Sequence, residues 1–340
     1  MSTYQEDLLN QPAALQNTIA VLTENSTIEQ VNRFCSPGHW SRFILTGMGS
    51  SYYSLYPLYR RLLKAQQPAW LIETSELLTL SELITRDTLI VANSQSGASA
   101  EIIRLLDSTV ANGQILGITN TAESPLSMRA DCALVTRAGL ETSVSCKTYL
   151  ASLAAQCWLG DRLIAGTDLF KDWINLPQAV AFYLAHWQQI VQSLEKTLAD
   201  IHQLYLVGRG DSMATAGTAG LILKESTHFP SEGMSSAAFR HGPFEMVGPH
   251  TLVVVFGGSA DVIDLNRKLL RDVQSSGGRS VLIESNDQIE VNAFTLPVCP
   301  PSALPVLEIL PVQMISLALA EIHHFSPGVF MLASKITSVE

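Results

Sequence analysis

A strand-like run followed by Gly-x-Gly and a polar segment occurs twice in this chain, and this repetition limits the fold more than any other feature. The two copies are Ile44–Ser51 (ILTGMGSS) and Tyr205–Ser212 (YLVGRGDS). Gly47 and Gly208 lie 161 residues apart, close to half of the 340-residue chain. The sequence therefore predicts a duplicated unit, with two domains of ordinary size.

Short apolar runs alternate with segments of helical period in both halves. The runs lie at residues 43–45, 70–72, 88–91, 115–118 and 133–135, and again at 205–207, 252–256 and 280–283. Strands that are apolar on both faces and alternate with helices are typical of a parallel sheet covered on two sides. We expect an α/β fold in each half.

Composition excludes several classes of protein. The net charge is −10 and no Lys/Arg run occurs, so neither nucleic acid nor a membrane is an expected partner. The apolar stretch Leu304–Ala320 is interrupted by Pro305, Glu308 and Pro311, which predicts a buried helix and not a membrane span. The N-terminus is acidic and polar, unlike a signal peptide, and we expect a cytoplasmic protein.

The cysteines of the chain are scattered and form no CxxC pair, which favours reduced, buried thiols. They are Cys35, Cys132, Cys146, Cys157 and Cys299.

The strongest chemical signal follows the third predicted strand, where residues 93–99 read NSQSGAS and lead into a helix. Hydroxyls and backbone N–H groups meet there at a helix N-terminus, which attracts anions. A helix cap alone would need only one such residue. Because the Gly-Lys-Ser/Thr of a nucleotide P-loop is missing, the cluster indicates a phosphomonoester site.

A dinucleotide site at the Gly-x-Gly turn is the alternative. Glu73 at the end of the second strand favours it, since an acid there would bind the ribose. Tyr52 and Met213 stand at the third glycine position of the two copies. Their bulk would separate helix from strand, which argues against a nicotinamide cofactor.

Several segments together resemble the double SIS (sugar isomerase) family, which includes the isomerase half of glucosamine-6-phosphate synthase and SIS-type amino-sugar-phosphate deaminases. Gly47–Ser51 is similar to the family's first sugar-contacting turn, and Ser94–Ser99 to its phosphate loop. Glu141–Lys147 resembles the segment that places a valine over the sugar. Lys224-Glu225, Arg240–Pro243 and Ser334-Lys335 match the catalytic segments.

The resemblance implies two tandem SIS domains, each flavodoxin-like with a parallel five-stranded sheet between helical layers. We expect an N-terminal helical segment at 1–39 and a first SIS domain at 40–170 with the phosphosugar site. A second SIS domain would follow at 171–325, and a tail at 326–340 would carry Lys335 back to the site.

The resemblance also implies roles for three residues. Glu225 would move a proton between C2 and C1, His241 would open the sugar ring, and Lys335 would stabilise the open-chain carbonyl or form a Schiff base with it. The ordinary alternatives are a surface ion pair of Glu225 with Lys224, a turn histidine and a solvated tail lysine. The expected substrate-binding residues are Ser51, Ser94, Gln95, Ser96, Ser99, Val144 and Ser334.

No metal or cofactor is expected, and the expected partner is a small phosphosugar. The family resemblance further implies a homodimer in which His241 is donated across the interface. Residues 232–242, a Gly- and Ser-containing excursion between a helix and the next strand, are compatible with that arrangement.

Two departures from the synthase pattern favour ammonia release. Ile222 stands where the synthase has a second lysine, and the first SIS motif is reached by residue 47, so a glutaminase half is not expected. We therefore expect a deaminase that converts glucosamine 6-phosphate to fructose 6-phosphate and ammonia. The alternatives are an enzyme for galactosamine 6-phosphate, fructosamine 6-phosphate or an aldose–ketose pair, and a non-catalytic sugar-phosphate sensor.

The second half has no Ser-Gln-Ser-Gly counterpart after Phe256, so catalysis is not expected there.

Overall fold

The computed structural model describes residues 3–36, 38–108, 113–286, 292–332 and 334–335. The chain divides into two compact units. The first-half unit comprises Ala13–Glu141, Ser145–Ile174 and the tail from Leu332. The second-half unit comprises Asn175–Met331, Thr142–Val144 and the residues up to Pro12. Each unit therefore includes segments that come from the opposite half of the sequence.

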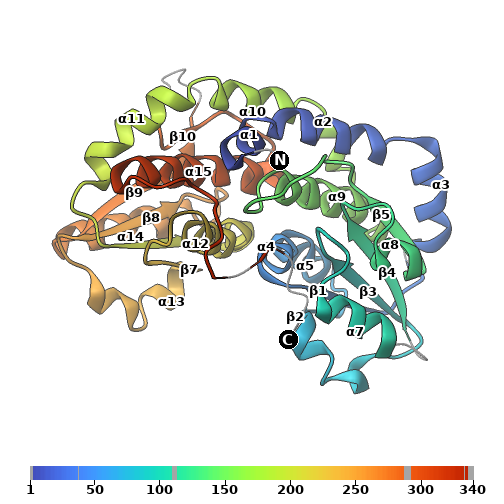
Figure 1. The fold of residues 1–340 in the computed structure, drawn as a ribbon. Helices are drawn as coiled ribbons and strands as arrows, with labels where there is room; N and C mark the ends of the chain where they lie inside the picture. Colours follow the sequence, from blue (N-terminus) through green and yellow to red (C-terminus); the bar gives the residue numbers. More distant parts are fainter. Residues whose placement is uncertain (1–2, 37, 109–112, 287–291, 333, 336–340) are drawn as a thin grey trace. The chain divides into compact units, whose positions relative to one another are not determined.

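The first-half unit is built on one parallel sheet in the order β2-β1-β3-β4-β5 (Figure 1). Alternate side chains of its strands enter different layers: Ile44, Ile90 and Ile115 pack with apolar residues of the helices on one face. The intervening residues, such as Leu45 and Val91, are also fully buried. The prediction of strands that are apolar on both faces is confirmed. The strands are β1 (Arg42–Gly47), β2 (Ala69–Glu73), β3 (Thr88–Asn93), β4 (Gln114–Thr119) and β5 (Cys132–Val135).

Helices cover both faces of this sheet. α4 and α5 pack with α9 over one face, and α7 packs with α6 and α8 over the other. α9 is buried along nearly its whole length, because apolar and small residues surround its axis. The helices are α2 (Gln11–Leu22), α3 (Asn25–Phe34), α4 (Gly49–Ser54), α5 (Tyr56–Lys64), α6 (Thr74–Leu77), α7 (Ala100–Ser108), α8 (Pro125–Arg129) and α9 (Lys147–Leu163), with short 3-10 turns η1 (Ser81–Leu83) and η2 (Phe170–Trp173).

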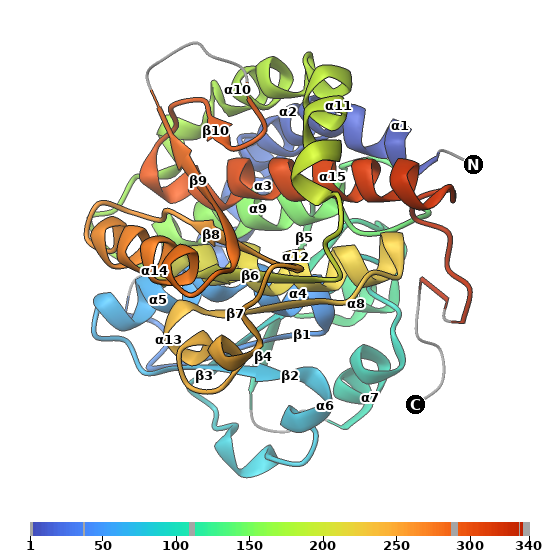
Figure 2. The ribbon, with the colours of Figure 1, turned by 90° about the vertical axis from the view of Figure 1, so that its left-hand side faces the viewer.

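The second-half unit repeats this topology. Its parallel sheet has the order β10-β9-β8-β6-β7, in which β6 occupies the place of β1 and β8 the place of β3 (Figure 2). The predicted duplication of a parallel five-stranded α/β unit is therefore confirmed. The strands are β6 (Gln203–Gly208), β7 (Ser231–Ser235), β8 (Thr251–Phe256), β9 (Arg279–Ser285) and β10 (Thr295–Leu296).

The helices of the second-half unit also form two layers. α12 and α15 pack together on one face, whereas α13 and α14 contribute to the apolar cluster on the other. The helices are α1 (Tyr4–Leu9), α10 (Leu176–Leu184), α11 (Trp187–Leu198), α12 (Met213–Thr227), α13 (Ser236–Phe239), α14 (Ile263–Ser275) and α15 (Leu304–His323), with 3-10 turns η3 (Gly210–Ser212), η4 (Pro243–Met246) and η5 (Pro301–Ala303).

Among the described residues, one helical stretch is long and apolar enough to cross a membrane. It is Pro301–His323, and 94% of its most apolar window is buried inside the structure. Every residue from Pro305 to Ala320 is buried. The predicted buried helix is therefore confirmed.

The interpretation of residues 232–242 as an excursion between a helix and the next strand is partly wrong. Residues 231–235 form the edge strand β7, which pairs in parallel with β6, and the short helix α13 follows it. The segment reads Ser-Glu-Gly-Met-Ser and lacks the β-branched residues that mark strands. Backbone pairing along β6 and the close packing of α12 stabilise it as a strand.

The cysteines are in their free form, and four of the five are buried. Burial raises the pKa of the Cys132 thiol to about 11 and that of the half-buried Cys299 to about 12. Since the thiolate is the reactive form, these side chains are apolar core groups rather than nucleophiles.

The carboxyl edge of the second sheet holds a buried acid, Glu308 of α15. Its carboxylate accepts hydrogen bonds from Ser212 Oγ at 2.7 Å and Thr215 Oγ1 at 3.1 Å, with a further backbone bond from Gly258. Burial, with the nearby Asp211 charge, raises the pKa of Glu308 to about 7 against these hydrogen bonds, which lower it. An internal carboxyl group thus occupies the turn that repeats the first sugar-contacting turn.

Glu308 makes the stability of the protein depend on pH. Between its ordinary value of 4.5 and about 7 the folded state binds more protons than the unfolded chain, so the free energy of unfolding falls as pH rises through this window. We expect Glu308→Gln to be more stable than the wild type at pH 8, by on the order of 3 kcal/mol, and to differ little at pH 4.5. Urea unfolding at both pH values measures this, with the exposed Glu195→Gln as control; an equal gain at both values would contradict it.

Candidate functional site

The turn of residues 47–51, predicted to contact the sugar, lies at the carboxyl end of β1. Gly47 has no room for a side chain, because a Cβ there would lie 2.8 Å from the Asn93 carbonyl oxygen. Asn93, the last residue of β3, donates from Nδ2 to the Ser51 carbonyl and to Ser54 Oγ, both at 2.9 Å. The half-buried Ser51 is therefore held beside the loop that follows β3.

That loop, residues 94–99, presents three hydroxyls. Ser94 Oγ accepts from the Gly97 N–H and Ser96 Oγ from the Ala98 N–H, both at 3.2 Å, and Ser99 Oγ accepts from the Ile102 N–H at 3.5 Å. A hydroxyl that accepts through a lone pair still has a hydrogen to donate. The three hydroxyls can thus donate to an anion at the N-terminus of α7, where the helix dipole is positive.

The loop is anchored to the end of β4. The carbonyl of Gln95 accepts from the Asn120 N–H at 3.0 Å and from Thr119 Oγ1 at 3.2 Å. Gly97 has φ +62, and an added Cβ would lie 2.7 Å from Ser124 Cβ. These contacts fix the position of the loop at the edge of the sheet.

The predicted tail lysine pairs with a buried carboxylate of the first-half unit. Lys335 Nζ lies 2.9 Å from Glu141 Oε2, and the side chains are 18% and 0% exposed. Glu141 also accepts at the start of α9, from the Cys146 N–H at 3.0 Å and from Thr148 Oγ1 at 2.6 Å. The alternative of a solvated tail lysine does not fit this geometry. Ser334, its neighbour, is exposed.

Glu225 is half-buried near the end of α12 in the second-half unit. α12 packs unusually close to β7, because a Cβ on Gly220 would come within 3.0 Å of Gly233 Cα. The neighbouring Lys224 has Glu232 as an ion-pair partner, with Nζ and Oε2 3.3 Å apart. Lys224 therefore has an ion-pair partner on β7.

A tail glycine connects the Glu225 end of α12 to the segment that carries Val144. The Gly328 N–H donates to the Ser226 carbonyl at 3.0 Å, and the Gly328 carbonyl accepts from Ser143 Oγ at 2.6 Å. Glu225 and Val144 are next in sequence to these two partners. Val144 itself is only 1% exposed.

His241 is exposed and directly follows α13 and Arg240. Arg240 pairs with Asp272 of α14 at 2.6 Å, and Lys268 and Arg240 hold the pKa of Asp272 below its ordinary value. Ser235 Oγ caps α13 by accepting from the Ala238 N–H at 2.9 Å. The base of the histidine segment is therefore fixed, while the imidazole faces solvent.

The candidate residues are thus distributed over both units. Ser51, residues 94–99, Ser334 and Lys335 belong to the first-half unit, and Glu225, His241 and Val144 to the second-half unit. The sequence reasoning did not assign a supporting role to the residues that hold them: Asn93 and Glu141 were named only as parts of motifs, and Asn120 and Gly328 were not named. A buried polar residue at a strand end was the only available signal, and it applies to Asn93 alone.

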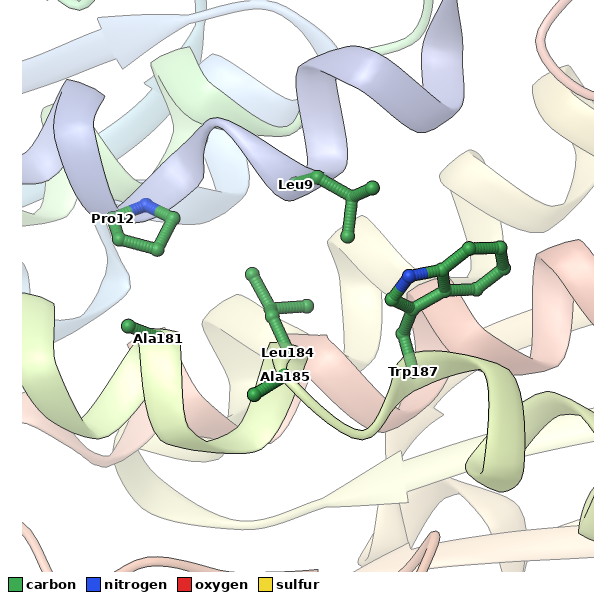
Figure 3. Close-up of a pocket in the computed structure, with 6 residues that line it drawn as sticks. All are labelled: Leu9, Pro12, Ala181, Leu184, Ala185 and Trp187. Carbon is green, nitrogen blue, oxygen red and sulfur yellow. The ribbon is translucent and has the colours of Figure 1, made fainter.

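An apolar pocket of the second-half unit lies between its helices (Figure 3). Its volume is about 330 Å³, and Leu9 faces Leu184 and Trp187 across it. Its side chains offer no charged group, so it does not suit a sugar phosphate. The residues that line this pocket are Leu9, Pro12, Ala181, Leu184, Ala185 and Trp187.

In the described part of the chain, no three His, Cys, Asp or Glu side chains are arranged to hold a metal ion.

Two matches to the SIS domain family profile cover residues 39–159 and 197–322. They account for more than half of the chain, which therefore belongs to the SIS domain family and carries two SIS segments. This confirms the resemblance inferred from the motifs.

Among curated proteins, the chain is 26% identical over 98% of its length to a glutamine–fructose-6-phosphate aminotransferase (isomerizing) of Thermococcus kodakarensis and covers 58% of that protein. It spans about half the length of the curated relatives it matches. Its fold is similar to that of the C-terminal domain of glucosamine-fructose-6-phosphate aminotransferase from Francisella tularensis (TM-score 0.82, 22% identity, 97% of this chain and 98% of the other). It is also similar to glucosamine-6-phosphate deaminase from Thermotoga maritima (TM-score 0.76, 21% identity, 98% and 100%).

The three hydroxyls of the loop predict how anion affinity changes on mutation. We expect Ser96→Ala with Ser99→Ala to weaken glucose 6-phosphate binding by about tenfold or more, because charge-assisted hydrogen bonds are worth about 1.5–3 kcal/mol each. Titration calorimetry measures the effect. Ser108→Ala, at the other end of α7, is the matched control and should bind as the wild type does. Wild-type affinity in the double variant would place the phosphate elsewhere.

Proposed function

We propose that this protein is an amino-sugar-phosphate deaminase, with glucosamine 6-phosphate as substrate and fructose 6-phosphate and ammonia as products. The observation that carries the proposal is the preformed loop of Ser94, Ser96 and Ser99 at the N-terminus of α7, in a chain that also has Glu225, His241 and Lys335 at the positions of the family's catalytic residues. A relative named as a glutamine–fructose-6-phosphate aminotransferase and a structural neighbour named as a glucosamine-6-phosphate deaminase support the substrate class.

The proposed reaction begins when His241 moves a proton at the ring oxygen, so that the sugar ring opens. Glu225 then takes the proton from C2 and returns it to C1, while the carbonyl oxygen at C1 gains a proton and the amino nitrogen loses one, so that the aldehyde-amine becomes a C2 imine with a hydroxyl at C1. Lys335 stabilises the charge that develops on the open-chain carbonyl oxygen. Water adds to the imine, and loss of ammonia leaves the ketose.

Ile222 supports the direction of ammonia release. It is fully buried in α12, one turn before Glu225, where the synthases that this chain resembles have a lysine. An apolar residue there cannot supply the charge of that lysine. The second candidate function, aldose–ketose isomerisation of another phosphosugar, needs the same proton transfer without the imine, and the loop geometry supports it equally.

An ammonium-release assay tests the proposal. Glucosamine 6-phosphate, galactosamine 6-phosphate, fructosamine 6-phosphate and glucose 6-phosphate are supplied separately, and both ammonium and ketose are measured. We expect ammonium from glucosamine 6-phosphate. Ketose formed from glucose 6-phosphate without ammonium from any amino sugar would favour the isomerase, and no turnover of any sugar would rule out both.

Glu225→Gln tests the proton transfer. The amide keeps the size of the side chain but cannot accept the C2 proton, so kcat should fall by about 10² or more with KM nearly unchanged. Solvent-deuterium incorporation at C1 and C2 reports this step apart from deamination. Glu232→Gln, on β7, is the matched control for loss of a neighbouring charge. Undiminished exchange in Glu225→Gln would assign the base to another residue.

The proposal includes a homodimer in which His241 acts in the partner subunit's site. The exposure of His241 at the end of α13 supports this. Glu225→Gln and His241→Asn, each inactive alone, should complement when refolded together. Half of the dimers would be mixed, with one intact site in each, so about a quarter of wild-type activity should return. If His241 acts within its own subunit, the mixture stays inactive, although mass spectrometry shows mixed dimers.

A further inference from the structure

The N-terminus of α9 holds a carboxylate to which the chain's own tail is bound. Glu141 Oε1 accepts the N–H groups of Cys146 at 3.0 Å and Thr148 at 3.2 Å. Its Oε2 accepts from Thr148 Oγ1 at 2.6 Å and from Lys335 Nζ at 2.9 Å. Both oxygens are therefore fixed by helix donors, and the Glu141 side chain is completely buried. Its position does not depend on the lysine.

The lysine, in contrast, comes from a segment with little structure of its own. Lys335 follows the exposed Leu332 and Ser334, and no helix or strand of the described chain includes any residue after His323. A lysine on such a segment would ordinarily sample many rotamers, at a cost of about 2 kcal/mol to fix. A prepositioned carboxylate lowers that cost before substrate arrives.

Glu141 is also linked to the phosphate loop. Asn120 donates its backbone N–H to the Gln95 carbonyl at 3.0 Å. Its side chain accepts from the Ala138 N–H at 2.7 Å and donates to the Gly139 carbonyl at 2.7 Å. Glu141 follows Gly139 by two residues along the backbone, so these hydrogen bonds fix the loop to the start of the segment that carries the Glu141 carboxylate.

We propose that Glu141 is the positioning residue for Lys335: it fixes the tail amine relative to the Ser94–Ser99 loop, so that the amine is in place when a phosphosugar binds. The catalytic part of this inference rests on the proposed function. The positioning itself rests on the contacts of Glu141 and can be measured without any substrate.

Acetylation kinetics measure the positioning. The protein receives a pulse of acetic anhydride, and mass spectrometry gives the labelling rate of each lysine. In the wild type, Lys335 should react about five- to tenfold more slowly than the exposed Lys64 of the same unit, because its amine must leave the ion pair first. In Glu141→Gln the amide still accepts from the helix N–H groups but cannot pair with the ammonium, and the Lys335 rate should rise to that of Lys64.

Asp161→Asn is the matched control. Asp161 lies at the other end of α9 and its side chain is 6% exposed. Its carboxylate pairs with Arg61 at 2.6 Å and accepts from the Phe170 N–H at 2.8 Å. This variant loses a comparable ion pair in the same helix without contact to Lys335. Its Lys335 rate should equal that of the wild type, which separates a positioning role from general loosening of the unit.

The catalytic arm uses the sugar that the wild type turns over. Glu141→Gln should lower kcat by about 10- to 100-fold through misplacement of the amine, with KM nearly unchanged because the phosphate is held by the loop. A merely structural role would lower the active fraction and leave the kcat of the folded enzyme intact, and circular dichroism with active-site titration distinguishes the two.

Two results would overturn the inference. One is rapid labelling of Lys335 in the wild type, which needs no variant and so applies even if Glu141→Gln fails to fold. The other is a Glu141→Gln enzyme with released Lys335 and unchanged kcat. Protection in the wild type that is lost in Glu141→Gln, from a protein that turns over no phosphosugar, would support the positioning and reject only the proposed function.

Discussion

Parallel pairing of β1 with β3 is the constraint on which the candidate site of the first-half unit depends. Parallel strands end at the same edge of a sheet, and the register sets Gly47 opposite Asn93. Asn93 can therefore bind the Ser51 carbonyl, and the turn and the phosphate loop leave the sheet side by side. Ligand sites of open α/β sheets lie at this edge, where neighbouring connections diverge. The helix dipole and the hydroxyls then make the edge suitable for a phosphate.

Features of the fold that follow from a local pattern of residues could be predicted from the sequence. The apolar runs located eight of the ten strands, the repeated Gly-x-Gly turn located the duplication, and the buried character of α15 followed from its composition. β7 was missed because Ser231–Ser235 carries no strand pattern, and β10 because two residues carry none. Both are edge strands, whose existence depends on the neighbour that they pair with.

The residues that support the site were beyond sequence reasoning for a related reason. Glu141 was recognised only as the first residue of a family segment, since its role depends on Lys335, 194 positions away. Asn120 and Gly328 likewise act through partners distant in sequence.

The two repeated Gly-x-Gly turns also differ in the side chain that contacts them, which their similar sequences do not reveal. In the first-half unit Gln156, a neutral amide, donates to Ser54 Oγ at 2.9 Å, whereas Glu308 binds Ser212 and Thr215 in the second. The second turn thus contacts an ionisable carboxyl group, whereas the first contacts a neutral amide.

The pairing of α15 with α1 and with the first residue of α2 has a consequence for synthesis on the ribosome. Gln11 and Gln313 exchange two amide hydrogen bonds, of 2.8 and 2.9 Å, across 302 residues, and Tyr4 bonds to Ser316. Translation at about 5–20 residues per second separates the two ends by about 15–60 seconds. During that time α15 is not yet present to make these hydrogen bonds with Tyr4 and Gln11. Of the two segments, the one that is made first therefore waits for the other, and a chaperone has most time to act on it.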